Sequence, residues 1–146
     1  MQPSTFFTHE QKERISLAIR DAELNTSGEI RVHLERKCKG EVLDRAAYLF
    51  EKLNIHKTAL RNGVLFYLVV DDQKFAILGD AGINAVTPED FWEEIRNKVM
   101  EEFREGRFAA GLEIGIRLAG EKLKEHFPYR EGDVNELPDE ISFNDH

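Results

Sequence analysis

The chain has 146 residues, of which 41% are hydrophobic and 33% are charged. This length predicts a single domain, and this composition excludes a low-complexity chain and wholesale disorder. With 28 acidic and 20 basic side chains, the formal charge is −8. Such a charge would repel a phosphate backbone, so we expect no nucleic-acid partner.

The sequence also predicts a compartment. A single cysteine, Cys38, excludes a disulfide within the chain and favours a reducing environment. Residues 1–7 lack the basic and apolar regions of a signal peptide. The longest apolar run, 64–70, is much shorter than the roughly 20 residues of a membrane span. We therefore expect a cytoplasmic protein without a membrane span.

The first third of the chain alternates between helical and strand patterns. Thr8 and Gln11 have the spacing of a capping box, which predicts a helix from residue 8 to about residue 25. Apolar and polar residues then alternate over 30–34, which predicts a strand with one apolar face. A helical apolar stripe follows over 41–54.

The middle of the chain predicts a hairpin. The apolar run 64–70 is typical of a strand that is buried on both faces. Residues 71–73 form a turn of hairpin length, and 75–78 form a second buried strand. A short fourth strand would fit near 83–86.

Two helices are predicted after the hairpin. Thr87 as a capping residue, with Pro88 at the first helical position, predicts the start of the first of them. Gly106 interrupts the pattern, and the last helix then runs from residue 108 to about residue 125.

This order of elements predicts the fold class. A strand, a helix and a second strand form a crossover unit, so the first two strands should be parallel. The second and third strands should pair as an antiparallel hairpin. We therefore expect an α/β sandwich in which helices cover both faces of a small mixed sheet.

This topology brings three turns to one end of the sheet, namely 26–29, 61–63 and 79–82. Their oxygen-bearing side chains, together with the end of the first helix, suit a hard cation such as calcium or magnesium. The candidate metal ligands are Glu23, Glu29, Asn62, Asp80 and Asn84. In the alternative interpretation, Glu29 is a solvated residue at a strand end and Asp80 caps the next turn.

A rival site lies at the other end of the sheet. Arg36, Lys37 and Lys39 could attract an anion there, although a basic surface loop is the favoured interpretation. Cys38 lies between the two lysines, but no base is assigned to it, which favours a bystander thiol. The sequence contains no phosphate-binding loop, dinucleotide fingerprint or zinc-protease motif.

Four stretches of the sequence resemble the TPM-domain family. They are AELNTSGEIRV at 22–32, RNGVL at 61–65, GDAGI at 79–83 and the glycine- and phenylalanine-containing stretch 103–112. The closest resemblance is to small bacterial members that stand alone. It implies a three-layer, Rossmann-like α/β/α sandwich over residues 7–127.

The remaining residues, 128–146, form an acidic, turn-rich tail that we expect to be loosely ordered. Ile141 and Phe143 could still attach this tail to the body of the domain. An acidic tail could also bind a protein partner.

The resemblance further implies that the chain binds divalent cations, calcium above all. Glu29, Asn62 and Asp80 stand in the matching motifs, and Glu23 belongs to the first of them. An acid phosphatase activity is attributed to some plant relatives, which are linked to photosystem II repair. Many relatives also carry a signal peptide and an anchor, and many have asparagine where this chain has Arg61.

Three functions follow as expectations. The first is a non-enzymatic regulatory or interaction module that binds a divalent cation, calcium rather than magnesium. The alternative is a metal-assisted acid phosphatase that acts on phosphate monoesters, with Asp80 or Glu29 activating water. The third is a protein-interaction domain that uses the acidic tail 131–146.

Overall fold

The computed structural model describes residues 2–130 and 136–144. In this part of the chain, four strands form one sheet in the order β3-β2-β1-β4. They are β1 (Glu29–Glu35), β2 (Gly63–Val69), β3 (Lys74–Gly79) and β4 (Ser142–Asn144). β1 is parallel to both of its neighbours, whereas β2 and β3 are antiparallel. The predicted α/β fold with a small mixed sheet is confirmed.

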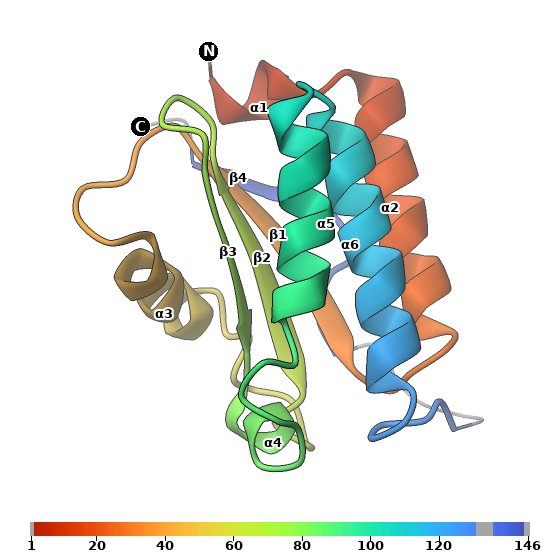
Figure 1. The fold of residues 1–146 in the computed structure, drawn as a ribbon. Coiled ribbons are helices and arrows are strands. Elements are labelled where there is room, and N and C mark those ends of the chain that lie inside the picture. Colours follow the sequence, from red (N-terminus) through yellow and green to blue (C-terminus); the bar gives the residue numbers. More distant parts are fainter. Residues whose placement is uncertain (1, 131–135, 145–146) are drawn as a thin grey trace.

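Helices cover both faces of the sheet (Figure 1). The helices are α1 (Pro3–Phe6), α2 (His9–Glu23), α3 (Val42–Lys52), α4 (Ala81–Asn84), α5 (Glu93–Arg104) and α6 (Phe108–Leu123). The helices α2, α5 and α6 lie on one face, and α3 lies on the other. Within the described residues, no helix has the combination of length and apolar character that crossing a bilayer requires.

The capping box at the start of α2 forms as predicted. Thr8 accepts a hydrogen bond from the backbone N–H of Gln11 at 3.1 Å. The side chain of Gln11 in turn accepts one from the backbone N–H of Thr8 at 2.9 Å. The two bonds satisfy donors that the first turn of a helix would otherwise leave unpaired, so the helix begins here.

β2 lies at the centre of two hydrophobic clusters, and all seven of its residues are buried. Val64, Phe66 and Leu68 belong to the larger cluster, which the residues of α2, α5 and α6 complete. The alternate residues Leu65 and Tyr67 belong to the smaller cluster beneath α3. A strand with apolar partners on both sides needs no polar face, which explains its continuous apolar run.

The prediction that a helix starts at Thr87 and Pro88 is wrong, because α5 begins at Glu93. The hydroxyl of Thr87 donates to the carbonyl of Ile83 at 2.8 Å. This side chain therefore closes the end of α4 and does not cap the helix that follows.

The proposed fourth strand at 83–86 is also wrong, because α4 and a turn occupy this stretch. The fourth strand is β4, which lies at the edge of the sheet beside β1. It belongs to residues 136–144, which we call the C-terminal segment. Ile141 in this segment is buried, and Phe143 packs against the larger cluster, so both side chains contact the body of the domain as expected.

Candidate functional site

The starts of β1 and β2 and the end of β3 meet at one edge of the sheet, which we call the rim. The backbone N–H of Glu29 donates to the carbonyl of Asn62 at 3.2 Å. The backbone N–H of Asp80 donates to the carbonyl of Gly63, the residue that pairs with Glu29, at 3.0 Å. The predicted convergence of the three turns is therefore confirmed.

Asp80 is held by a cation from its own chain. Its two carboxylate oxygens accept hydrogen bonds from Arg61, from Nε at 2.7 Å and from Nη2 at 2.8 Å. One of these oxygens also accepts the backbone N–H of Ala81 at 2.7 Å, which caps α4. Because the guanidinium neutralises this carboxylate, the Asp80 side of the rim does not fit a divalent cation while the pair persists.

The two asparagines brace the loops of the rim. Asn62 is buried, and its side-chain amide donates to the carbonyl of Ser27 at 3.2 Å. The side-chain amide of Asn84 donates to the carbonyl of Gly79 at 3.3 Å. The first contact connects two of the rim turns, and the second holds α4 against the end of β3, so both side chains have a structural task whether or not a ligand binds.

Glu29 fastens the C-terminal segment to the rim. Its side chain is buried, and Oε1 accepts hydrogen bonds from the backbone N–H groups of Glu136 and Leu137, the latter at 2.8 Å. Burial raises the pKa of Glu29 to about 7, although these two hydrogen bonds act in the opposite direction.

Glu23 lies at the end of α2, and its carboxylate faces the start of β1, close to Glu29. Its Oε2 accepts the backbone N–H of Ile30 at 3.3 Å. Burial, followed by a hydrogen bond with Asp139 and the charge of that residue, raises the pKa of Glu23 to about 9, and Glu29 adds to the effect. Glu23, Glu29 and Asp139 thus form a group that we call the acidic cluster.

The five predicted ligands therefore fall into two groups. Glu23 and Glu29 belong to the acidic cluster, whereas Asp80 is paired with Arg61 and the asparagines support loops. Across 2–130 and 136–144, no three His, Cys, Asp or Glu side chains are arranged to hold a metal ion. The acidic cluster nevertheless has the chemistry that a hard cation requires, because its donors are carboxylate oxygens.

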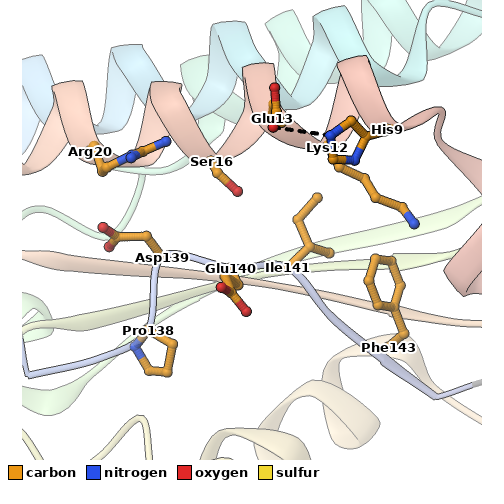
Figure 2. A pocket seen from close by; sticks show the side chains of 10 residues that line it. All are labelled: His9, Lys12, Glu13, Ser16, Arg20, Pro138, Asp139, Glu140, Ile141 and Phe143. Atoms are coloured by element: carbon orange, nitrogen blue, oxygen red, sulfur yellow. Dashed lines mark ion pairs between the residues drawn. The ribbon is translucent and has the colours of Figure 1, made fainter.

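A cavity of about 760 Å³ adjoins the acidic cluster. It lies between α2 and the C-terminal segment (Figure 2). Lys12 and Arg20 line it from α2, and Asp139, Glu140 and Ile141 line it from the segment. The cavity therefore combines basic, acidic and apolar walls.

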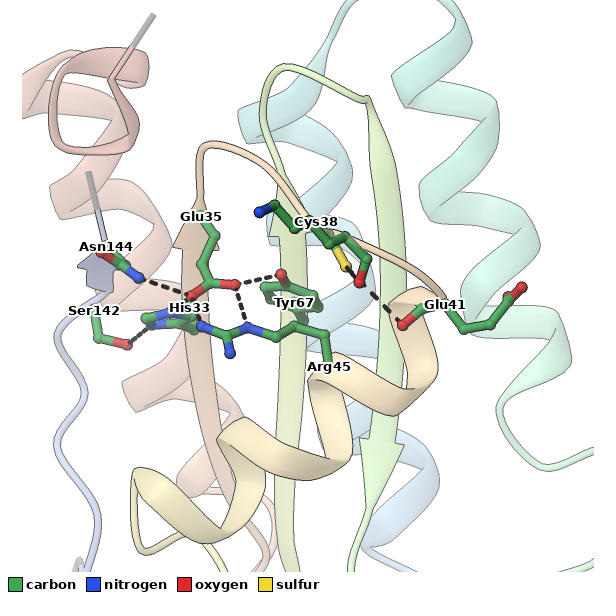
Figure 3. A network of polar contacts seen from close by, with 9 residues as sticks. His33, Glu35, Cys38, Glu41, Arg45, Tyr67, Ser142 and Asn144 are labelled. Carbon is green, nitrogen blue, oxygen red and sulfur yellow. Dashed lines mark hydrogen bonds and ion pairs between the residues drawn. The ribbon is translucent and has the colours of Figure 1, made fainter. Parts of the chain in front are cut away.

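A network of buried polar side chains occupies the opposite end of β1 (Figure 3). Glu35 accepts two hydrogen bonds from Arg45, from Nε at 2.9 Å and from Nη2 at 2.6 Å. It also accepts the hydroxyl of Tyr67 at 2.5 Å and the side-chain amide of Asn144 at 3.1 Å. Burial acts to raise the pKa of Glu35, but these hydrogen bonds together hold it well below its usual range.

His33 extends this network to β4. Its Nδ1 lies 2.6 Å from the hydroxyl oxygen of Ser142, and its Nε2 lies 3.6 Å from Oε2 of Glu35. The hydroxyl of Ser142 also donates to the carbonyl of Val32 at 3.3 Å. In the rival basic loop, Arg36 pairs with Asp71 at 3.0 Å.

Sequence reasoning missed the partners that the C-terminal segment supplies to both sites. The alternating pattern predicted one apolar and one polar face for β1, and Glu29, His33 and Glu35 on the polar face are buried. The available signal was the apolar pair Ile141 and Phe143, whose spacing of two residues is typical of a strand.

Comparisons with known proteins agree with this fold. Residues 1–122 match the TPM domain family. The chain is 48% identical to the BA42 protein from the psychrophilic bacterium Bizionia argentinensis. The NMR structure of BA42 matches this structure with a TM-score of 0.91, over 95% of this chain and 96% of that chain.

Two more distant structures share the fold alone. An N-terminal domain from P. gingivalis is 20% identical, with a TM-score of 0.71 over 88% of this chain and 84% of that chain. The N-terminal domain of the cg2496 protein from Corynebacterium glutamicum is 12% identical, with a TM-score of 0.59 over 99% of this chain and 85% of that chain. No curated protein matches the chain.

Proposed function

Because the chain belongs to the TPM-domain family, we propose that it is a regulatory module that binds a divalent cation at the acidic cluster. The observation that carries this proposal is the gathering of Glu23, Glu29 and Asp139 around one partly buried place. Burial and mutual repulsion raise the pKa of Glu23 to about 9 and burial raises that of Glu29 to about 7. A divalent cation in place of the bound protons would compensate both the desolvation of these carboxylates and their mutual repulsion.

Calcium suits this place better than magnesium. Calcium accepts six to eight oxygens in flexible arrangements, whereas magnesium requires a near-ideal octahedron. Glu29 and Glu23 are already tied to backbone N–H groups of Leu137 and Ile30. Because these hydrogen bonds restrict the carboxylate oxygens, the oxygens would surround a bound cation in an irregular arrangement. Such an arrangement favours the larger ion, calcium.

A regulatory role follows from the partners of Glu29. Since Glu29 holds the backbone of the C-terminal segment, a cation at this carboxylate would compete with, or reinforce, the attachment of that segment. The cation would thus act on a contact between parts of the chain more than 100 residues apart.

We propose binding rather than phosphate ester hydrolysis. A phosphoryl group needs cationic groups to stabilise its charge. The guanidinium of Arg61 is engaged by Asp80 at the rim, and the acidic cluster would repel a phosphate ester. The same carboxylates attract a cation.

A calcium titration followed by amide NMR tests the proposal. The amides of Ile30 and Leu137 should shift at millimolar calcium, because they donate to Glu23 and Glu29. Magnesium at the same concentration should shift them less. The absence of a calcium shift at both amides would refute cation binding at this place.

Two matched variants locate the site. Glu23→Gln should abolish the calcium shifts, whereas Asp80→Asn should preserve them, because Asp80 is paired with Arg61. The opposite result would place the cation on the Asp80 side of the rim. Equal hydrolysis of a generic phosphate ester by the wild type and both variants would show that these carboxylates do not catalyse it.

A further inference from the structure

The C-terminal segment lies along β1 like a bound peptide. Its last part, β4, pairs in parallel with β1 from His33 to Glu35. Its first part donates two backbone N–H groups to Glu29. Between them, Arg31 donates to the carbonyl of Pro138 at 3.4 Å. The pairing of β4 with β1 is the main-chain contact that recurs where an extended peptide adds a strand to a sheet, and the side chains of Glu29 and Arg31 add hydrogen bonds to the backbone of the segment.

The side chains of the segment are divided between the two faces of the sheet, and they alternate strictly over 141–144. Leu137 is buried in the cluster beneath α3. Ile141 is buried in the cluster on the α2 side, against which Phe143 also packs. On the α3 side, Ser142 and Asn144 contact His33 and Glu35. Pockets for alternate side chains supply specificity in strand addition.

The edge of β1 and the neighbouring helix α2 form a groove, and the C-terminal segment lies in it. The groove and the segment come from different parts of the chain. The family match ends at residue 122, so β1 and α2 lie within it and the C-terminal segment lies beyond it. The residues of the family match therefore form the groove, and the C-terminal segment beyond them occupies part of it.

The segment does not fill the groove. The cavity of about 760 Å³ remains between α2 and Asp139, Glu140 and Ile141 (Figure 2). Lys12 contributes one basic wall, with its Nζ 5.1 Å from the ring centroid of Phe143, and Arg20 contributes another. A peptide with larger side chains at these positions would fill more of this space. An acidic side chain that faces Lys12 and Arg20 would match their charge, whereas one beside Glu13 or Glu23 would be repelled.

We propose that the edge of β1, together with α2, is a peptide-binding groove that the C-terminal segment occupies in cis. The partner is an extended peptide segment that lies parallel to β1 and places acidic side chains opposite Lys12 and Arg20. It carries apolar residues with the spacing of Leu137, Ile141 and Phe143. This groove does not require cation binding, so the test is made in the presence of a chelator.

The test measures fluorescence anisotropy of a labelled peptide, ELPDEISFN, which has the sequence of residues 136–144. The full chain is used as wild type and as Ile141→Asn, which weakens the cis segment without changing the groove. The variant should bind the peptide about tenfold more tightly or better, because apparent affinity scales with the fraction of open groove. A scrambled peptide should bind to neither chain.

Leu43→Asn is the matched control, because Leu43 is 57% exposed on α3 and lies outside the groove. It should bind the peptide as the wild type does. A peptide with alanine at the position of Ser142 should bind to Ile141→Asn several-fold more weakly, since it lacks the contact with His33.

A second variant keeps the test decisive if circular dichroism shows that Ile141→Asn is unfolded. Ser142→Ala combined with Asn144→Ala removes polar contacts and leaves the apolar ones in place. A folded variant of either kind that binds the peptide no better than the wild type, or that binds the scrambled peptide equally, overturns the proposal. Tighter, sequence-dependent binding supports it.

Discussion

Glu29 and Glu35 stand at the two ends of the same strand, and both are buried, with 4% and 2% of their surface exposed. Their surroundings nevertheless act on them in opposite directions. The pKa of Glu29 is raised to about 7, mainly by burial. The pKa of Glu35 is held well below its usual range despite burial, because Arg45, Tyr67 and Asn144 donate to it.

This contrast shows that burial alone does not decide the state of a carboxylate. A guanidinium in bidentate contact compensates the desolvation of Glu35, so that end of β1 holds a permanent ion pair. Glu29 accepts backbone N–H groups and lies near other carboxylates without a cationic side chain among its hydrogen-bond donors in the described residues, so its surroundings favour the protonated form. One strand therefore has a structural end and a responsive end.

The largest effect at a fixed pH should come from breaking the ion pair at the structural end. Arg45→Met leaves the buried charge of Glu35 without its cation and should lower the free energy of unfolding by about 3–5 kcal/mol. Urea unfolding monitored by circular dichroism measures this loss. Arg36→Met is the control, because it breaks the more exposed pair with Asp71 and should cost far less. Equal losses in both variants would contradict the contrast.

The next effect concerns the pH dependence at the responsive end. The pKa of Glu23 is about 9 in the folded chain, against an ordinary 4.5. Below pH 4.5 both states are protonated, and at higher pH the unfolded state ionises first. Stability should therefore fall between about pH 5 and pH 9, by at most about 1.4 kcal/mol per pH unit.

Glu23→Gln should flatten this fall, because glutamine does not titrate. Unfolding in urea at a series of pH values provides the measurement. A variant that loses stability as steeply as the wild type over the same window would show that Glu23 is not the group responsible.

A smaller effect is expected where the C-terminal segment meets the structural end. Asn144→Ala removes one hydrogen bond to Glu35, while Arg45 and Tyr67 retain theirs. The cost should be about 0.5–1.5 kcal/mol, the usual net value of one hydrogen bond. Amide hydrogen exchange in β4 should accelerate more than exchange in β2. Uniform acceleration throughout the sheet would contradict a local role.

The weakest effect should appear on the Asp80 side of the rim. Arg61→Asn removes the guanidinium, and asparagine tolerates the positive φ of 51° at this position. Calcium in the millimolar range should then shift the amide of Ala81, which donates to Asp80. The same amide should stay unchanged in the wild type. A shift of equal size in both would mean that Arg61 does not exclude a cation.

Local patterns were sufficient for the elements whose signals lie within a few residues. The capping box of Thr8 and Gln11 located α2, and the apolar run of β2 identified a strand covered on both faces. The signal at Thr87 failed although it is equally local, because its hydroxyl is used by Ile83. A capping residue has only one side chain, and the tertiary structure decides which helix end that side chain hydrogen-bonds.

The candidate site was predicted in its position and not in its chemistry. The order of the strands places Glu29, Asn62 and Asp80 at one edge, since parallel neighbours and a hairpin allow no other arrangement of their ends. The pairing of Asp80 with Arg61 and the approach of Asp139 to Glu23 depend on side-chain directions. Spacing along the chain contains no information about these directions.

The sequence by itself determined the strands β1, β2 and β3, their parallel and antiparallel pairing and the family of the domain, because hydrophobic periodicity and short motifs are properties of neighbouring residues. Only the tertiary structure decided which carboxylates have a raised pKa, which have a lowered pKa, and what covers the polar face of β1. Those outcomes depend on partners that lie far away in the chain, such as Asn144, which is 109 residues from Glu35. The electrostatic free energy of a buried group is set by its neighbours in space.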